Sequence, residues 1–438
     1  MKKPNTIGSA ATAVLAAALM TTTSAMLAPQ AHASTDPFYE YSGQQPLSEI
    51  TPGTVLATRT VPYHLSGVAT PLTAVQLLYR TTDAQQRPSV NVTSVLIPPG
   101  ADPAEAVAYQ SAYDSLDPDD GPSRAIAGTA TPTGALVNTT DGAFVSQFLA
   151  QRRAVIVADV EGPRATLGTG PEYGRATLDS IRAATRSTAT GLSPDTRIGL
   201  FGYSGGGIAT TWASALAPTY APDIDQRLVG AAAGGVMVDF PRTVHYIDGS
   251  GFWAGVMVPT VIGLARAYDI DLTPYLSDYG AQLLTQLDNA SINDALGHYP
   301  GLKWEQLAKP EYRDPDSIPS LAEATRQADL ELAPTPTTPM FIGQGTDGTL
   351  EGTDNTKPGI GPGDGVMIAG DVRTLARRYC DTGNHAITYR QYGALSHVTA
   401  LPVWSVDAFS WLNDRFAAVP APTNCTEIAP ENPHTDGN

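Results

Sequence analysis

The sequence feature that most constrains the fold is the segment Gly202-Tyr203-Ser204-Gly205-Gly206. An apolar run of strand character ends there, and a helix-compatible segment follows at once. This is the nucleophile-elbow pattern G-x-S-x-G, in which a sharp turn holds the serine in a strained conformation. Residues 202 and 206 must lack a Cβ because strand and helix approach closely. In a chain with 41 glycines such a turn can arise by chance, but this is its only G-x-S-x-G. We therefore predict that Ser204 is a catalytic nucleophile.

Strand-like and helical patterns alternate along most of the chain. The strand-like runs are short, β-branched and bounded by Gly, Pro or Asp, and lie at residues 54–61, 73–80, 91–98, 106–110, 154–159, 197–202, 227–233, 339–343 and 386–392. Helical patterns lie at residues 142–152 and 176–189. Such alternation predicts an α/β fold with a mostly parallel sheet and helices on both faces.

The N-terminal residues have the pattern of a secretory signal peptide. Lys2 and Lys3 precede an apolar, Ala-rich stretch, and Ala31-His32-Ala33 supplies small residues at the cleavage positions. A membrane anchor is the weaker alternative because residues 21–24 interrupt the apolar run, which is too short for a span. We expect residues 1–33 to be removed near Ala33 and the mature protein to be exported.

The remaining chain divides into a core, an insertion and a tail. Residues 34–239 and 334–425 carry the alternating pattern and form the predicted hydrolase-type core. Residues 240–333 break the alternation and sit between two predicted strands, as an inserted cap or lid would. Residues 426–438 are rich in Pro, Thr, Asn and Glu, which predicts a flexible tail.

Charge and cysteine content exclude several classes of function. Loss of residues 1–33 removes two lysines and no acids, which changes the formal net charge from −17 to −19. A nucleic-acid binder needs a basic face, and anionic lipid surfaces would repel such a chain, whereas a neutral lipid or ester surface would not. Cys380 and Cys425 are the only cysteines, and in an exported protein they predict one disulfide. With no H-E-x-x-H and no cysteine cluster, we expect neither a metal nor a cofactor.

A serine nucleophile needs a base that a carboxylate orients. His397 lies just past the last predicted strand and before a helix, the position and order expected when acid and base follow the nucleophile. Two acids remain candidates for the carboxylate that orients His397. Asp347 is favoured because it lies closest to the end of the strand at 339–343, whereas Asp364 precedes the next helix, where an Asp commonly only caps it.

These residues, together with further marks, resemble the secretory lipase family, the lipase A type of α/β-hydrolase. The marks span nearly the whole mature chain in order: Asp36-Pro37-Phe38-Tyr39, Tyr79-Arg80-Thr81-Thr82-Asp83, Tyr109-Gln110, Tyr113-Asp114-Ser115, Asp159-Val160-Glu161-Gly162-Pro163, Leu178-Asp179, Arg182-Ala183, the elbow, Tyr379-Cys380 and Ser396-His397.

The resemblance implies a triad of Ser204, Asp347 and His397, a lid, and fat or ester substrates. It also implies an oxyanion hole formed by backbone N–H groups of Gly205 and Asp114. The chain departs from the family pattern in its longer loop from Gly348 to Gly363, which bears on the choice between the two acids.

We therefore expect a secreted serine hydrolase that cleaves carboxylic esters of lipids, a triacylglycerol lipase or carboxylesterase. Its partners would be a lipid or small ester and, transiently, a neutral lipid interface. The alternatives are a secreted acyltransferase that acts on cell-envelope lipids with the same triad, and a catalytically silent lipid-binding protein.

Overall fold

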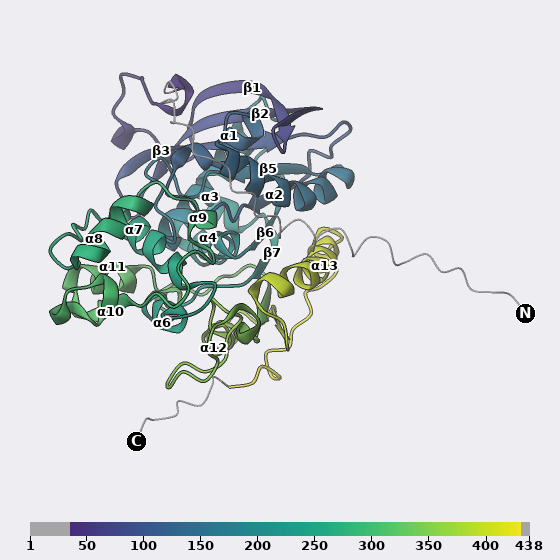
Figure 1. Cartoon of the computed structure of the whole chain (residues 1–438). Helices are drawn as coiled ribbons and strands as arrows, with labels where there is room; N and C mark the ends of the chain where they lie inside the picture. Colours follow the sequence, from purple (N-terminus) through teal and green to yellow (C-terminus); the bar gives the residue numbers. More distant parts are fainter. Residues whose placement is uncertain (1–35, 431–438) are drawn as a thin grey trace, which may run out of the picture. The chain divides into compact units, whose positions relative to one another are not determined.

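The described strands form one twisted sheet whose parallel part carries the predicted elbow (Figure 1). A computed structural model of the chain describes residues 36–430, so the predicted signal peptide lies outside the described residues. The order is β1-β2-β3-β5-β4-β6-β7-β8-β9. The strand bounds are β1 Val55–Leu65, β2 Val68–Thr82, β3 Pro88–Leu96, β4 Glu105–Gln110, β5 Ala154–Ala158, β6 Arg197–Tyr203, β7 Leu228–Gly234, β8 Met340–Gly345 and β9 Ile387–Tyr392. Each predicted strand has its counterpart here.

The direction of pairing changes at β5. β1, β2, β3 and β5 pair antiparallel in succession, whereas every neighbouring pair from β5 to β9 is parallel. Parallel strands need crossover helices, which cover both faces of the sheet. The sheet and helices confirm the predicted α/β-hydrolase fold.

Helices lie on both faces of the sheet. Their bounds are α1 Pro122–Ala127, α2 Pro132–Ala150, α3 Gly170–Arg186, α4 Gly205–Tyr220, α5 Pro222–Asp225, α6 Phe240–Ile247, α7 Met257–Tyr268, α8 Asp278–Leu287, α9 Ile292–Ala295, α10 Trp304–Leu307, α11 Pro319–Gln327, α12 Ala369–Asp381 and α13 His397–Phe416. Successive residues of β6 show the division, since Leu200 belongs to the same buried cluster as residues of α3, α4 and α12, whereas Phe201 packs against rings of α2 and α13. The alternation follows from the period of two along a strand.

Residues 240–333 form the helical segment between β7 and β8. Its first helix, α6, begins where Asp239 caps it by accepting a hydrogen bond from the N–H of Arg242 at 2.9 Å. Figure 1 shows α7, α8, α10 and α11 gathered together, and their apolar side chains join the core on the α4 side of the sheet. Among the described residues, 38–430 belong to one compact unit.

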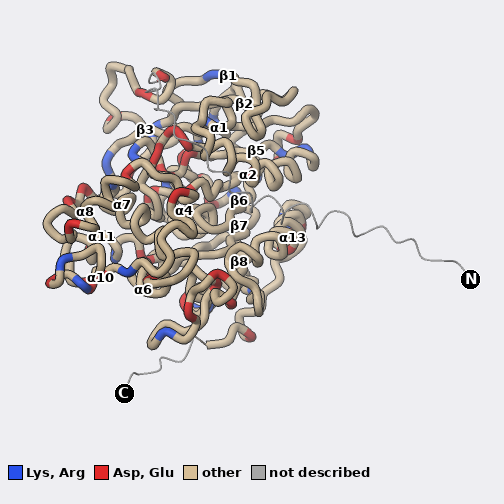
Figure 2. The backbone as a smooth tube through the Cα atoms, in the orientation of Figure 1, with Lys and Arg blue, Asp and Glu red and all other residues tan. Residues whose placement is uncertain are grey.

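Charged residues are spread over the fold. Among residues 36–430, Lys and Arg are scattered rather than gathered on one element (Figure 2). No described helix has both the length and the apolar character that crossing a membrane requires.

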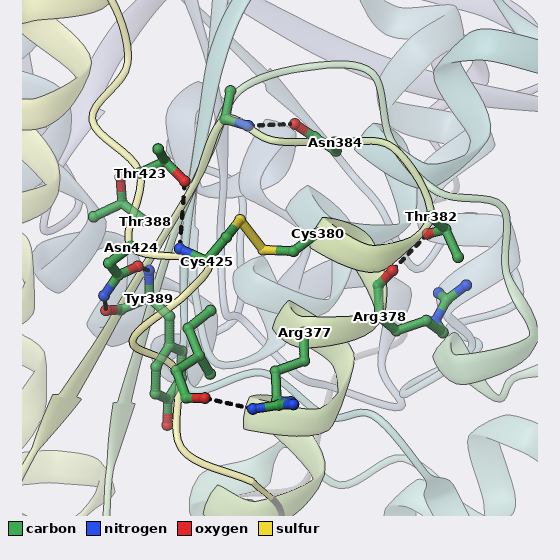
Figure 3. Close-up of a disulfide and its surroundings, with 12 residues drawn as sticks. Arg377, Arg378, Cys380, Thr382, Asn384, Thr388, Tyr389, Thr423, Asn424 and Cys425 are labelled. Carbon is green, nitrogen blue, oxygen red and sulfur yellow. Dashed lines mark hydrogen bonds between the residues drawn. A yellow bond between two sulfur atoms is a disulfide. The ribbon is translucent and has the colours of Figure 1, made fainter.

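The predicted disulfide is present and closes the C-terminal part of the fold. Cys380, in the last turn of α12, is bonded to Cys425 beyond α13 (Figure 3). Asn424 pairs with the outer edge of β9, accepting from the N–H of Tyr389 at 2.9 Å and donating to its carbonyl at 2.7 Å. Of the predicted flexible tail, residues 426–430 are described, and among them Ile428 is buried and its carbonyl accepts from Arg377.

We expect removal of this disulfide to destabilise the fold. Cys380→Ser should lower the free energy of unfolding by about 3 to 4 kcal/mol, because the bond closes a loop of 45 residues in the unfolded chain. Urea unfolding of the variant and the parent measures this difference. Detection of two free thiols in the denatured, unreduced parent would contradict the bond itself.

Candidate active site

The turn between β6 and α4 has the geometry predicted for a nucleophile elbow. Ser204 has φ 59° and ψ −124°, a conformation that is costly for a residue with a side chain. A Cβ on Gly202 would collide with the carbonyl oxygen of Gly206, and one on Gly206 with that of Gln110 at the end of β4. The missing side chains therefore allow β4, β6 and α4 to meet, and this contact holds Ser204 at the sheet edge.

Ser204, His397 and Asp364 form a continuous hydrogen-bonded chain. The Oγ of Ser204 lies 2.8 Å from Nε2 of His397, and Nδ1 of His397 lies 2.8 Å from Oδ2 of Asp364. With a carboxylate at Nδ1, that nitrogen donates and Nε2 accepts from the serine hydroxyl. His397 is 3% exposed and Asp364 is fully buried. The arrangement can transfer a proton from Ser204 to His397.

The structure corrects the predicted acid. Asp347 is not the partner of His397, and its carboxylate accepts from the hydroxyl of Thr349 in the same loop. After β8 the N–H groups of Thr346 and Asp347 both donate to the carbonyl of Leu395, at 2.9 and 3.0 Å, which fixes the direction in which the chain leaves the strand. The chain then passes through the 3-10 turn Gly348–Glu351 and returns at Gly363. Asp364, the alternative acid, thus lies beside the base.

Asp364 is fixed from several sides. Its Oδ1 accepts from the N–H groups of Val366 and Met367 at 3.1 and 2.7 Å, and its Oδ2 also accepts from Nε2 of Gln344 at 2.8 Å. Its carbonyl accepts from the N–H of His397 at 2.6 Å. Asp364 does not cap α12, which begins only at Ala369. These donors hold the buried carboxylate of Asp364 in one orientation.

Neighbouring acids raise the pKa of His397 above its usual 6.5. Burial, the largest single effect, acts to lower the pKa, but the charge and hydrogen bond of Asp364 and the charges of Glu351 and Asp114 together outweigh it. These acids stabilise the imidazolium that forms when His397 takes a proton.

Asp114 and Gly205 lie together beside Ser204, as the resemblance implies. Gly205 opens α4, where the first N–H groups have no partner within the helix. A Cβ on Gly205 would collide with the carboxyl group of Asp114, whose backbone has a φ of 37°. The carbonyl of Asp114 accepts from the N–H of Ile292 at 2.7 Å, so the insertion holds this loop in place.

An apolar pocket adjoins Ser204. It is lined by Asp114, Leu167, Gly168, Ser204, Gly205, Ile208, Met237, Phe240, Thr243, Val244, Ile247, Trp253, Val256, Met257, Thr260, Ile292, Val366 and Met367. Half of these residues come from the inserted segment 240–333. A mostly apolar lining with few polar groups suits a hydrophobic ligand.

Among the described residues, one group could hold a metal ion, on the surface of the insertion. Ligand atoms of His245, Asp314 and Asp316 lie within 4.8 Å of one another, and all three residues are exposed. None of them lines the pocket at Ser204.

The sequence analysis did not single out Gln344 and Glu351, which lie close to Asp364 and His397. Gln344 lies near the end of β8. This position is the one sequence signal that could have identified it, because catalytic groups gather at strand ends. The indole of Trp253 lies 5.2 Å from the ring of His397, and its Nε1 donates to Glu351 at 2.5 Å. Glu351 lies in a loop without a periodic pattern, so no sequence signal marks it.

A hydrogen-bonded Ser–His–Asp chain at the carboxyl ends of parallel strands, with the serine on an elbow, defines an α/β-hydrolase site. Comparison with known proteins assigns the family. A family model described as secretory lipase matches residues 130–424, and the chain belongs to this secretory lipase family.

Individual relatives match over most of their length. A protein of Mycobacterium tuberculosis (strain CDC 1551 / Oshkosh) named probable inactive lipase is 34% identical, with 88% of this chain and 83% of that protein covered. Lipase 4 of Candida albicans is 28% identical, with 90% and 84% covered. The crystal structure of Candida antarctica lipase A in its closed state has a TM-score of 0.78 and 26% identity, with 90% and 89% covered. The family membership and these similarities support hydrolysis of lipid esters as the class of activity.

The carboxyl group of Asp114 should make stability depend on pH. Burial raises its pKa from 3.8 to about 7, an effect that His397 reduces and Asp141 increases. The folded state therefore binds more protons than the unfolded state between these values, and stability is lost as pH rises through the window. Asp114→Asn removes this loss, so its stability relative to the parent should rise by roughly 1.4 kcal/mol per pH unit from about pH 4 to 7 and then level off.

Urea unfolding of both proteins across this range measures the difference. Asp278→Asn, which removes an exposed carboxylate at the beginning of α8, controls for a general effect of lost charge. A difference between Asp114→Asn and the parent that does not change with pH would contradict the assignment.

Proposed function

We propose that this protein is a secreted serine hydrolase that cleaves carboxylic esters of lipids through a Ser204–His397–Asp364 triad. The observation that carries the proposal is the chain of two 2.8 Å hydrogen bonds from Ser204 through His397 to Asp364, beside an apolar pocket. Geometry of this kind is what acyl transfer by a serine requires.

In the first half of the reaction, His397 acts as the general base. It takes the proton of Ser204 as Oγ attacks the ester carbonyl, and Asp364 stabilises the resulting imidazolium. The N–H groups of Gly205 and Asp114 are the proposed donors to the oxyanion. The imidazolium then protonates the departing alcohol, which leaves an acyl-enzyme on Ser204.

In the second half, water replaces the alcohol. His397 takes a proton from the water as it attacks the acyl carbon, and the second tetrahedral intermediate uses the same two N–H donors. Collapse of this intermediate returns the proton to Ser204 and releases the carboxylic acid. The triad is regenerated without a cofactor.

The pocket argues for a substrate with an apolar acyl chain. Trp253, Val256, Met257 and Thr260 lie on successive turns of the insertion and line the pocket that begins at Ser204. We propose that residues 240–333 are a cap and that this inner face contacts the acyl chain. The predicted signal peptide, residues 1–33, supports export of the mature protein.

Experiments distinguish the hydrolase from the two alternatives, an acyltransferase and a silent binding protein. An acyltransferase would use the same acyl-enzyme but pass the acyl group to an alcohol, so product analysis of a long-chain ester with and without an alcohol acceptor distinguishes it. A silent binding protein would lack turnover. The relative named probable inactive lipase makes this second alternative worth testing, although all three groups of the triad are present in this chain.

Replacement of the nucleophile gives the most direct test. Ser204→Ala should abolish hydrolysis of p-nitrophenyl esters and covalent labelling by a fluorophosphonate. It should leave the thermal unfolding curve nearly unchanged, because loss of one hydroxyl at the site costs little stability. Labelling that persists at another serine would contradict the assignment of Ser204. A parent that neither hydrolyses esters nor reacts with the probe would refute a hydrolase.

The two acids should differ sharply in effect. Asp364→Asn should lower kcat by roughly 10⁴, because an amide at this position favours the wrong imidazole tautomer. Asp347→Asn should have little effect on kcat, since its carboxylate contacts Thr349 in the same loop. Steady-state kinetics with p-nitrophenyl butyrate measures both variants, and the reverse ranking would return the role to Asp347.

A further inference from the structure

The loop between β8 and Asp364 braces the cap. The N–H groups of Gly251 and Phe252 donate to the carbonyls of Gly352 and Glu351 at 2.9 and 3.2 Å. Two segments far apart in the sequence, one from the cap and one from the acid loop, thus lie side by side. The long loop therefore has a role in the fold beyond connecting β8 to Asp364.

A second contact fixes the end of α6 to the same loop. Nζ of Lys357 donates to the carbonyls of His245, Tyr246 and Asp248 at 3.0, 2.9 and 2.5 Å. The ammonium group supplies donors that the carbonyls at a helix C-terminus lack, and its charge complements the helix dipole. The hydroxyl of Tyr246 also donates to Oδ1 of Asn355 at 2.8 Å.

Glu351 connects this loop to the first turn of α13, next to His397. Its Oε2 accepts from Nε1 of Trp253 at 2.5 Å, and its Oε1 accepts from the N–H of Val398 at 2.9 Å. Val398 directly follows His397 in the first turn of α13. A carboxylate at this helix N-terminus is favoured by the helix dipole. Trp253 itself lines the acyl pocket and packs edge-on against the ring of His397 at 5.2 Å.

We propose that Glu351 is a positioning residue whose single carboxylate fixes both Trp253 of the cap and the first turn of α13, so that cap position and the environment of His397 are coupled. This inference rests on the proposed function because it concerns the same base and the same acyl pocket. A movement of the cap that carries Trp253 away must break its bond to Glu351. The acyl pocket and the base therefore change together.

The charged groups around His397 make the coupling measurable. Asp364 contacts the ring directly, Glu351 faces it from the loop, and Asp114 faces it from the turn after β4, while the rings of Trp253 and Tyr203 pack at 5.2 and 5.0 Å. The negative charge of Glu351 raises the pKa of His397. Removal of this charge should therefore lower that pKa.

Three variants of the full chain test the proposal. Glu351→Gln keeps the size of the side chain but removes its charge and one acceptor. Trp253→Phe keeps an aromatic ring but removes the N–H donor, and it leaves the charge of Glu351 in place. Asp354→Asn is the matched control, because this carboxylate lies in the same loop and, among the described residues, accepts hydrogen bonds only from Thr356.

The first measurement is the titration of His397 by NMR, with its signal assigned by its loss in His397→Gln. Glu351→Gln should lower the pKa by about half a unit or more, whereas Trp253→Phe and Asp354→Asn should not. The second is amide hydrogen exchange of residues 251–257, which should become faster in both Glu351→Gln and Trp253→Phe. The double variant should exchange no faster than the faster single one, because Trp253→Phe removes the bond between these two side chains and Glu351→Gln weakens that same bond.

Activity provides the third measurement. Both single variants should change the ratio of kcat/KM between long-chain and butyrate esters several-fold, and Asp354→Asn should not. The proposal is overturned if Glu351→Gln matches Asp354→Asn in the titration of His397 or in exchange of the cap. These two measurements need no turnover. An inactive parent would thus refute the proposed hydrolase, while the same two measurements would still decide the role of Glu351.

Discussion

The site depends on the contact of three backbones around Ser204. β4, β6 and α4 meet where Gly202 and Gly206 present no side chain, and a Cβ at either position would strike a carbonyl oxygen. The surrounding structure therefore over-determines the φ of 59° at Ser204, which an isolated turn would relax. Because the nucleophile is fixed at the sheet edge, only loops that follow neighbouring parallel strands can reach it. Asp364 and His397 arrive on such loops, after β8 and β9.

Buried carboxyl groups set the electrostatics of this edge. Burial raises the pKa of Asp114 to about 7 and that of Asp141 to about 6, and raises the pKa of Glu161 well above its usual range. Glu161 accepts from the N–H of Ser115 at 3.1 Å and from the hydroxyl of Tyr173 at 3.0 Å, so it supports the turn that contains Asp114. A buried acid costs stability but orders this loop through directional hydrogen bonds. Of these acids, Asp114 favours positive charge on His397, the charge that it acquires in the proposed reaction.

The sequence predicted those parts of the site that local patterns determine. Ser204 lies in a motif that is defined by adjacent residues alone, and His397 lies shortly after a strand. The structure has Asp364 rather than the predicted Asp347 beside His397, because the position of a carboxylate depends on the path of the whole loop after β8. A count of residues from the strand end does not describe that path. α2 likewise begins at Pro132 rather than at residue 142, with Thr131 as its cap, although Gly and Thr in its first half are poor helix formers. In both cases tertiary packing outweighed the local preference.

The length of the loop between β8 and Asp364 explains why choosing the acid closest to the strand end gave Asp347. Had Asp347 been beside His397, the chain could have turned back directly after β8. The carboxylate of Glu351 and the amine of Lys357, which contact residues 240–333, would then have had no segment to carry them. Instead the chain first passes along residues 240–333, to which Glu351 and Lys357 form hydrogen bonds. It then returns so that Asp364 lies beside His397. Asp364 thus lies at the end of a loop that contacts with residues 240–333 hold in place. Residues 240–333 and Asp364 are consequently parts of one packed unit, and the loop from Gly348 to Gly363 is the connection between them.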